Sequence, residues 1–190
     1  MKRFFDLFFS FVGLVLLCIP LIILIVLATI SAGKFGLYSQ IRIGLRGNPF
    51  RMYKIRSMLI SDDTTTITLK NDARITKFGQ FLRRYNLDEL PQLFNVFIGD
   101  MSLVGPRPDV TGYADTLTGD DRIMLEVRPG ITGPATLKYK NEESLLMEQK
   151  NPRQYNDEVI WKDKVYMNRK YIENWSLMGD IRIILKTFFN

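Results

Sequence analysis

The 190-residue sequence contains no histidine and only one cysteine. Without histidine, the usual Ser-His-Asp and Cys-His nucleophilic sites are excluded. A structural zinc site is excluded as well, because it needs about four Cys or His ligands, and one cysteine cannot form an intramolecular disulfide. Any chemistry must therefore come from carboxylates, lysine, arginine, hydroxyl groups or a metal ion that is bound through oxygen.

Positive charge is in excess, since 26 Lys and Arg against 20 Asp and Glu give a formal net charge of +6. Such a balance favours an anionic partner, which can be nucleic acid, membrane head groups or a phosphorylated substrate. Hydrophobic residues make up 46% and charged residues 24% of the chain, a composition that excludes a disordered protein. The length predicts one domain rather than two.

No charged residue occurs between Leu7 and Ala32. An apolar run longer than about 18 residues predicts a membrane-embedded segment, and a signal peptide would have a shorter apolar core of about 7–15 residues. Pro20 lies inside the run, where it removes a helical hydrogen bond, and basic residues flank both ends, so the positive-inside rule gives no orientation. Two interpretations stay open: a re-entrant helix that bends at Pro20, and a single-pass helix with a tolerated kink.

The rest of the chain predicts a small β-hairpin followed by several helices. Residues 36–56 are typical of two strands joined by a turn at 45–48. Apolar residues at helical spacing predict helices over residues 75–85, 86–98, 153–174 and 180–189. Polar or Pro/Gly-rich composition predicts irregular segments at residues 61–73, 101–109 and 127–135. The last helix is either an interfacial helix, basic on one face and apolar on the other, or an ordinary core helix.

Asp88 and Glu89 are adjacent carboxylates at the predicted start of the helix over residues 86–98. There the helix dipole and the free N–H groups favour negative charge. We therefore expect Asp88 to be ionised, which suits a nucleophile or a ligand of a hard metal ion. The same position suits an aspartate that only caps the helix, and the local pattern by itself favours capping.

Basic side chains at turns and strand ends form a possible phosphate clamp, because a guanidinium group pairs with phosphate through two hydrogen bonds. The candidates are Lys54, Arg56, Arg84, Arg107 and Arg128. The alternative is a solvated basic face, or one that contacts anionic lipid. The sequence has no Walker or Rossmann phosphate loop and no pattern of a known RNA-binding module, so nucleic acid is not an expected partner.

Residues 88–108, DELPQLFNVFIGDMSLVGPRP, resemble the signature of the bacterial sugar transferases, also called monotopic phosphoglycosyl transferases. Four other segments are similar to the family in the same order. They are the N-terminal Lys-Arg-x-x-Asp with its apolar run, the FRMYKIRSM strand, the RITKFGQFLRRYNLDELPQ segment and the RPGITGPA turn. The resemblance therefore covers essentially the whole chain.

The resemblance implies an α+β, mostly helical monotopic membrane protein with a re-entrant N-terminal helix, a small β-hairpin and interfacial amphipathic helices. Residues 1–34 would form the re-entrant membrane helix, broken at Pro20. Residues 35–190 would form the catalytic domain on the cytoplasmic face of the bacterial inner membrane. The chain matches the minimal form of the family, without the additional N-terminal spanning helices of larger members.

The resemblance also implies transfer of a sugar-1-phosphate from a UDP-sugar to a polyprenol phosphate, usually undecaprenyl phosphate, with release of UMP. This would be the first membrane step in the assembly of a surface polysaccharide or glycoconjugate. Asp88 matches the nucleophile that forms a covalent aspartyl phospho-sugar, Glu89 matches its dyad partner, and Arg107 matches a contact to substrate phosphate. Mg²⁺ is the expected cofactor, with Asp88 as a ligand.

Two rival functions follow from the residues without the resemblance. The first is a non-enzymatic membrane adaptor that binds anionic lipid through its basic face while Asp88 only caps a helix. The second is a membrane-tethered nucleic-acid binder that uses the net charge. Two segments also depart from the family: the helix break is Ile19-Pro20 where several relatives have Ser-Pro, and residues 135–146 differ. The sequence therefore does not identify the sugar, for which N-acetylated or amino-deoxy hexoses are expected.

Overall fold

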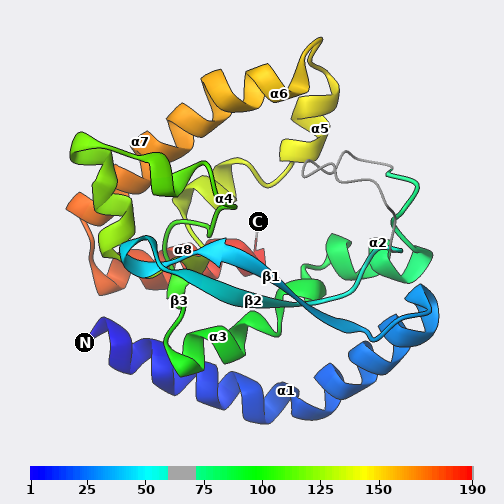
Figure 1. The fold of residues 1–190 in the computed structure, drawn as a ribbon. Coiled ribbons are helices and arrows are strands. Elements are labelled where there is room, and N and C mark those ends of the chain that lie inside the picture. Colours follow the sequence, from blue (N-terminus) through cyan, green and yellow to red (C-terminus); the bar gives the residue numbers. More distant parts are fainter. Residues whose placement is uncertain (60–71, 190) are drawn as a thin grey trace.

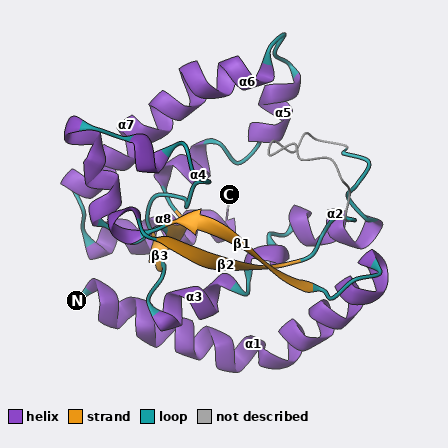
Figure 2. Cartoon of the chain, in the orientation of Figure 1, coloured by secondary structure: helices purple, strands orange, loops and turns teal. Residues whose placement is uncertain are grey.

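The computed structural model describes residues 1–59 and 72–189. This part of the chain is mostly helical and has two two-stranded sheets (Figure 2), which confirms the α+β class. The irregular segment predicted at 61–73 lies almost entirely outside the described residues.

The elements follow one another along the chain as Figure 1 shows. The helices are α1 (Lys2–Ala32), α2 (Lys77–Arg84), α3 (Gln92–Ile98), α4 (Pro134–Lys138), α5 (Glu142–Met147), α6 (Pro152–Tyr155), α7 (Trp161–Glu173) and α8 (Leu177–Phe189). The strands are β1 (Leu37–Ile43), β2 (Pro49–Ile55), β3 (Ser102–Val104) and β4 (Gly130–Thr132). The short helical turns are η1 (Leu45–Gly47), η2 (Leu87–Glu89), η3 (Ala114–Thr116), η4 (Gly119–Glu126) and the π-helical η5 (Asn156–Ile160).

Helix α1 is long and apolar enough to cross a membrane by length and composition, with a mean hydropathy of 3.2 in its most apolar window. It continues through Pro20 without interruption. Figure 1 shows it as a bowed helix that curves beneath α3 and the β1–β2 hairpin, and a proline that lacks one helical hydrogen bond favours such bending. The expected break at Pro20 is therefore not seen in this helix, which bends instead. A re-entrant path through the membrane remains a prediction.

The N-terminal end of α1 is fastened to the rest of the chain by polar side chains. Lys2 forms an ion pair with Asp180 of α8, at 2.6 Å. The guanidinium group of Arg3 donates to two backbone carbonyls at the end of α3, at 2.6 and 2.9 Å. Asp6 is buried and accepts a hydrogen bond of 2.9 Å from the Ser102 hydroxyl group. The basic and acidic residues of the N-terminal motif therefore hold α1 against α3, β3 and α8.

The C-terminal end of α1 packs into an apolar core of the same domain. Ala28, Ile55 and Leu82 are all fully buried there and join α1 to β2 and α2. The chain then folds back closely, because a Cβ atom on Gly36 would lie 2.1 Å from the Ile25 carbonyl oxygen. Both ends of α1 therefore contact the folded remainder of the chain. The exposed apolar residues lie along the helix between these two contacts.

The predicted hairpin is confirmed, since β1 and β2 pair antiparallel with Leu37 opposite Ile55 and η1 occupies the predicted turn. The prediction of irregular structure at residues 101–109 and 127–135 is partly wrong, because β3 and β4 pair in parallel there. The pairing needs glycine, since a Cβ atom on Gly130 would lie 2.1 Å from the backbone nitrogen of Gly105. The glycines that suggested loops therefore allow two backbones to approach.

The other predicted helices are present, with differences in detail. Helix α2 lies within the predicted range 75–85, and the range 153–174 holds α6 and α7 with the π-helical η5 between them. Helix α8 covers the predicted range 180–189. Its Leu185 and Phe188 are 51% and 78% exposed, so these two residues do not belong to a core. An interfacial position of α8 stays a prediction.

Candidate active site

Asp88 and Glu89 lie in η2, a single helical turn between α2 and α3. The chain enters this turn through Asn86, whose left-handed conformation (φ 53°) is one that asparagine tolerates better than most residues. Pro91 directly precedes α3, where its missing N–H is not needed. The α-helix begins at Gln92, so the prediction that it begins near residues 86–88 is wrong.

Asp88 is only 8% exposed. Among the described residues its carboxylate accepts no hydrogen bond, so Asp88 does not cap a helix. Burial raises the pKa of Asp88, Lys54 opposes that shift and Glu89 adds to it. The sequence suggested that a helix terminus would favour the ionised form of Asp88. This reason is wrong, because Asp88 precedes the helix and desolvation outweighs the effect of the nearby charges on its pKa.

Glu89, in contrast, has two cationic partners. Lys54 Nζ donates to Oε1 at 2.9 Å. Arg107 spans the carboxylate, with Nη2 at 2.5 Å from Oε1 and Nη1 at 3.4 Å from Oε2. Burial alone would raise the pKa of Glu89, but the charges of Arg107 and Lys54 hold it well below its usual value. The Glu89 charge in turn raises the pKa of Arg107, so both groups stay ionised.

Asn95 holds the two elements of the site together. Its Oδ1 accepts a hydrogen bond of 3.0 Å from the backbone nitrogen of Tyr53, and its Nδ2 donates to the Arg51 carbonyl at 2.7 Å. Both of these groups belong to β2, the strand that carries Lys54, whereas Asn95 belongs to α3. Asn95 is fully buried, so it fixes the position of Lys54 relative to Glu89.

Arg42 and Asp109 lie beside Arg107 and were not selected from the sequence. Arg42 Nη1 donates to the Pro108 carbonyl at 3.3 Å, and burial and the Arg107 charge lower its pKa. Burial raises the pKa of Asp109 to about 6, although Lys164 and Arg42 act against the shift. Alternation along β1 could have identified Arg42, because side chains two residues apart share one face of a strand. No local pattern marked Asp109.

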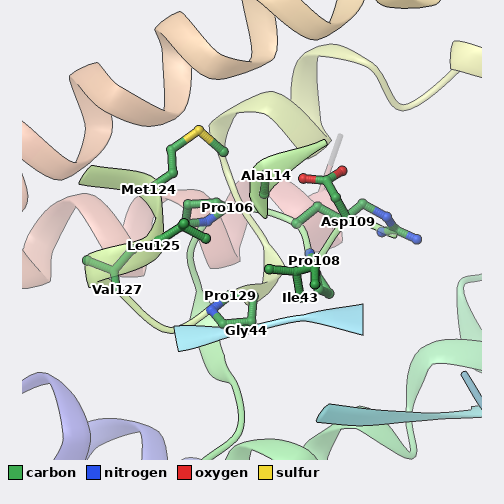
Figure 3. Close-up of a pocket in the computed structure, with 11 residues that line it drawn as sticks. Ile43, Gly44, Pro106, Pro108, Asp109, Ala114, Met124, Leu125, Val127 and Pro129 are labelled. Atoms are coloured by element: carbon green, nitrogen blue, oxygen red, sulfur yellow. The ribbon is translucent and has the colours of Figure 1, made fainter. Parts of the chain in front are cut away.

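A small pocket lies behind the Pro-Arg-Pro turn (Figure 3). Met124, Leu125 and Val127 line one side of it, and the Asp109 carboxylate points away from them. Side chains of this kind offer no hydrogen-bond donor to a phosphate group. Arg107 and Asp109 also line the pocket, so the pocket lies directly against the turn that carries Arg107.

The structure brings four of the predicted site residues together. They are Asp88, Glu89, Lys54 and Arg107. Arg83, which lies shortly before the Asn86–Glu89 segment in the sequence, contributes to the same electrostatic field, because its charge opposes the rise in the pKa of Asp88. It also forms an ion pair of 3.1 Å with Glu143 of α5.

The other three candidate cations bind groups of the protein itself. Arg128 Nε donates to the Gly99 carbonyl at 2.7 Å, where α3 ends. Arg56 Nε donates to the Phe35 carbonyl at 3.0 Å, and its guanidinium group lies over the ring of Tyr38. The third, Arg84, is exposed on α2, with its guanidinium group over the neighbouring tyrosine ring. The structure gives none of the three a contact with the Asp88–Glu89 turn.

A metal ion would find few ligands supplied by the protein. In the part of the chain that the structure describes, no three His, Cys, Asp or Glu side chains are grouped so that they could hold one. Glu89 is engaged by Lys54 and Arg107, which leaves Asp88 as the free carboxylate of the turn. Mg²⁺ in phosphate-transfer sites is often held by one or two carboxylates together with substrate phosphates. The residues therefore fit an ion that binds together with a diphosphate.

Known proteins resemble the chain over nearly its full length. The model of the bacterial sugar transferase family matches residues 1–190. The uncharacterized sugar transferase EpsL of Bacillus subtilis (strain 168) is 36% identical over 189 residues, which cover 98% of this chain and 85% of EpsL. The UDP-glucose:undecaprenyl-phosphate glucose-1-phosphate transferase of Klebsiella pneumoniae is 35% identical over 195 residues, covering 99% of this chain and 39% of that protein.

The undecaprenyl-phosphate galactose phosphotransferase of Salmonella typhimurium is 35% identical over 204 residues, covering 98% of this chain and 39% of that protein. The chain thus spans most of EpsL but about two fifths of the two transferases with named substrates.

Proposed function

Since the chain belongs to the bacterial sugar transferase family, we propose that it transfers a sugar-1-phosphate from a UDP-sugar to a polyprenol phosphate such as undecaprenyl phosphate. One observation carries the proposal: Asp88 is buried with no hydrogen-bond partner among the described residues, beside a carboxylate that holds two cations in place. We take these substrates from the names of the relatives, whose chains extend well beyond the part that this chain matches.

In the first step, a carboxylate oxygen of Asp88 attacks the phosphorus atom that carries the sugar. The bond from this phosphorus to the bridging oxygen breaks, and UMP leaves with the electron pair. The product is an aspartyl phospho-sugar, a mixed anhydride. Carboxylates form such acyl phosphates in other phosphoryl-transfer enzymes, and no imidazole is needed for the attack.

In the second step, a phosphate oxygen of the polyprenol phosphate attacks the same phosphorus atom. The bond to Asp88 breaks, which restores its carboxylate and yields a polyprenyl diphosphate sugar. Because one transfer is split into two displacements, the nucleotide part of the donor leaves as UMP before the lipid acceptor reacts. The lipid tail can remain in the bilayer throughout.

The surroundings of Asp88 suit a nucleophile. A carboxylate that is already hydrogen-bonded would have to break those bonds before it attacks, whereas Asp88 has none in the described structure. Burial raises its pKa, and a more basic carboxylate is a stronger nucleophile once it is ionised. The charge of Lys54, which opposes the shift, helps to keep the ionised form available.

Glu89 acts as a positioning residue that presents cations to the substrate phosphates. The Arg107 side chain is 44% exposed while it pairs with Glu89, so its guanidinium group can also donate a hydrogen bond to a phosphate oxygen. The Lys54 side chain is only 11% exposed, so its charge acts on the substrate phosphates from inside the protein. Arginine and lysine held in this way offset the negative charge of a transferring phosphoryl group.

We include Mg²⁺ in the proposal, with Asp88 as its protein ligand. When bound, the ion would neutralise charge on the diphosphate. Binding of Mn²⁺ in the presence of UDP, followed by electron paramagnetic resonance, tests the ligand. Asp88→Asn should weaken the binding of Mn²⁺ to the UDP-loaded protein, and an unchanged affinity would remove Asp88 from the metal site.

We further propose that α1 is re-entrant and that the catalytic domain lies on the cytoplasmic face of the bacterial inner membrane. The support is that both ends of α1 contact one body, through Lys2 at one end and Ala28 at the other. A spanning helix would separate its ends by the thickness of the bilayer, about 30 Å of hydrocarbon. A bowed helix with Pro20 in its exposed middle can keep both ends on one side.

Single-cysteine labelling tests the path of α1. In a Cys18→Ala background, exposed positions at the two ends, Phe4 and Phe35, are each changed to cysteine. A membrane-impermeant reagent should label both cysteines in inside-out vesicles and neither in intact spheroplasts. Labelling of the Phe4→Cys variant from outside the cell would refute the re-entrant path. Pro20→Leu should favour the spanning path, so that a Phe4→Cys change in this background is labelled from outside the cell.

Trapping the intermediate tests the chemistry. The protein is incubated with a UDP-sugar and no lipid acceptor, and its intact mass is measured. We expect a mass increase of one phospho-sugar, with peptide mapping that places it on Asp88, and no increase in Asp88→Asn. An adduct on another residue would contradict the assignment of the nucleophile. A panel of UDP-sugars in the same assay, with UMP release as the readout, would identify the donor.

A further inference from the structure

Gln92 is the first residue of α3 and lies four positions after Asp88. It is only 2% exposed. The amide nitrogen Nε2 of its side chain is buried and has no hydrogen-bond partner among the described residues. Burying a donor without an acceptor lowers the stability of a fold, so native proteins contain few such groups, and some of them serve a reaction. The position of Gln92 next to the proposed nucleophile favours that explanation.

The backbone places Gln92 and Asp88 on one buried face. Leu90 and Pro91, which join η2 to α3, are both right-handed helical, so the helical path is continuous from Asp88 to Gln92. Residues four apart on such a path are neighbours. One turn further along, the same face carries Asn95, which is fully buried and bonds to the backbone of β2. Gln92 therefore lies between Asp88 and the bonds that hold α3 against β2.

The side-chain acceptors nearest to Gln92 along the chain are already engaged, with one exception. The carboxylate of Glu89 is bound by two cations, and Asn95 Oδ1 accepts from the backbone of β2. The exception is Asp88, whose carboxylate accepts no hydrogen bond among the described residues. A buried donor without an acceptor and a buried acceptor without a donor therefore lie one turn apart.

The burial of Gln92 Nε2 indicates which acceptor it can serve. Because this nitrogen has almost no exposed surface, its acceptor must come from the protein and not from a substrate that arrives through solvent. In an aspartyl phospho-sugar, one oxygen of Asp88 is bonded to phosphorus and the other is a carbonyl oxygen. The oxygen bonded to phosphorus faces the substrate, so the carbonyl oxygen points into the protein. There it needs a donor that the protein itself supplies.

We propose that Gln92 is a positioning residue for Asp88, an inference that rests on the proposed transfer reaction. Its Nε2 donates a hydrogen bond to the inner oxygen of Asp88 while the outer oxygen attacks phosphorus, and it keeps this bond to the carbonyl oxygen of the aspartyl phospho-sugar. The two groups are not bonded in the described structure, and catalytic hydrogen bonds are often long before the substrate binds. The bond holds the outer oxygen in one orientation, which lowers the barrier to attack.

Rapid quenching of the first turnover tests the proposal. The full-length protein is mixed with a UDP-sugar in the absence of lipid acceptor, and the rate at which the adduct forms on Asp88 is measured. Gln92→Met and Gln92→Leu remove the donor and should slow adduct formation at least about tenfold. The affinity for the UDP-sugar, from the concentration dependence of the rate, should stay within about twofold of the parent. The melting temperature of Gln92→Met should not fall, because an apolar group of similar length replaces a buried donor without a partner.

Asn168→Leu is the matched control. Asn168 belongs to α7, is 3% exposed, and its Oδ1 also has no hydrogen-bond partner among the described residues. This variant should form the adduct at the parental rate per folded molecule.

The outcomes separate the role of Gln92 from the reaction itself. A parental rate in both Gln92 variants, or an equal loss in Asn168→Leu, would overturn the proposal while the transfer reaction stands. A slower rate together with a lower melting temperature in both Gln92 variants would show a structural role and would also overturn it. If the parent formed no adduct on Asp88, the transfer reaction on which the inference rests would be overturned as well.

Discussion

Asp88 and Asp180 are both buried aspartates, but their surroundings differ. Asp180 is 1% exposed and accepts hydrogen bonds from Lys2 at 2.6 Å, from the Tyr171 hydroxyl group at 2.6 Å and from the Trp175 indole at 3.0 Å. These partners join α1, α7 and α8 around one carboxylate. Asp88 is 8% exposed, and in the described structure it accepts no hydrogen bond at all.

The difference shows how burial alone fails to identify a reactive acid. A buried carboxylate that receives a full set of donors is stabilised where it is, and it stabilises the elements that supply those donors. A buried carboxylate without donors lowers the stability of the fold and stays available to a substrate. The two aspartates illustrate the two cases within one chain, and each can be tested against the other.

The largest effect is expected for the chemistry of Asp88. Asp88→Asn should lower UMP release from the UDP-sugar by at least about 10³-fold, because an amide cannot form the acyl phosphate. The protein should remain folded, with an unchanged far-UV circular dichroism spectrum. Asp180→Asn is the matched control and should keep a turnover within a few-fold of the parent per folded molecule. Equal losses in both variants would remove the distinction between the two acids.

The second effect concerns the stability that Asp180 provides. Asp180→Asn should lower the free energy of unfolding by about 3 kcal/mol, because the partly buried Lys2 loses its counter-charge and the buried carboxylate loses its charge-assisted hydrogen bonds. Thermal unfolding followed by tryptophan fluorescence measures the change, with Trp175 as a local probe. Asp120→Asn, at a side chain that is 90% exposed, should have no effect. If Asp180→Asn were as stable as the parent, the ion pair between Lys2 and Asp180 would not stabilise the fold.

The third effect concerns Glu89, the neighbour of Asp88. Glu89→Gln should destabilise the protein at neutral pH by about 2 kcal/mol, since Lys54 loses its partner while the half-exposed Arg107 regains water. The pKa of Glu89 is lowered in the fold, so its contribution is present above the unfolded pKa and is lost as the pH falls. The difference in melting temperature should therefore shrink on acidification, and a constant difference would contradict the ionised pair.

The smallest effect is expected for Asp88 itself, and it has the opposite sign. Because the pKa of Asp88 is raised in the fold, the ionised carboxylate destabilises the native state at neutral pH. Asp88→Asn should therefore raise the melting temperature, by about 2 °C. The gain should disappear as the pH falls and the parent carboxyl becomes protonated. A loss of stability at neutral pH would mean that Asp88 has a structural role like that of Asp180.

Local patterns predicted the parts of the fold that local physics determines. Alternating and β-branched residues predicted the β1–β2 hairpin, and helical spacing predicted α2, α7 and α8. The start of α3 was wrong because the left-handed Asn86 inserts a separate turn before Gln92. No periodicity reports such a backbone change at one residue.

The site was predictable as a set of residue types and not as an arrangement. Lys54 and Arg107 were both selected from the sequence, but their convergence on Glu89 joins residues 35 and 18 positions apart. Arg128 had the same local appearance as Arg107 and instead binds the Gly99 carbonyl. Asn95 gave no signal within an apolar helix, because its function depends on which backbone groups of β2 face it. Tertiary contacts decide these outcomes.

The attachment of α1 at both of its ends has a consequence for how the proposed lipid acceptor would find the site. A protein held by one tether can rotate about it, so a membrane-bound reactant meets the site in few of the orientations sampled. Two points of attachment remove that rotation and leave diffusion in the plane of the membrane as the main search. Fixed orientation lowers the entropy that must be lost when the reactants align. The bonds of Lys2 and the packing of Ala28 would then contribute to the encounter rate as well as to the fold.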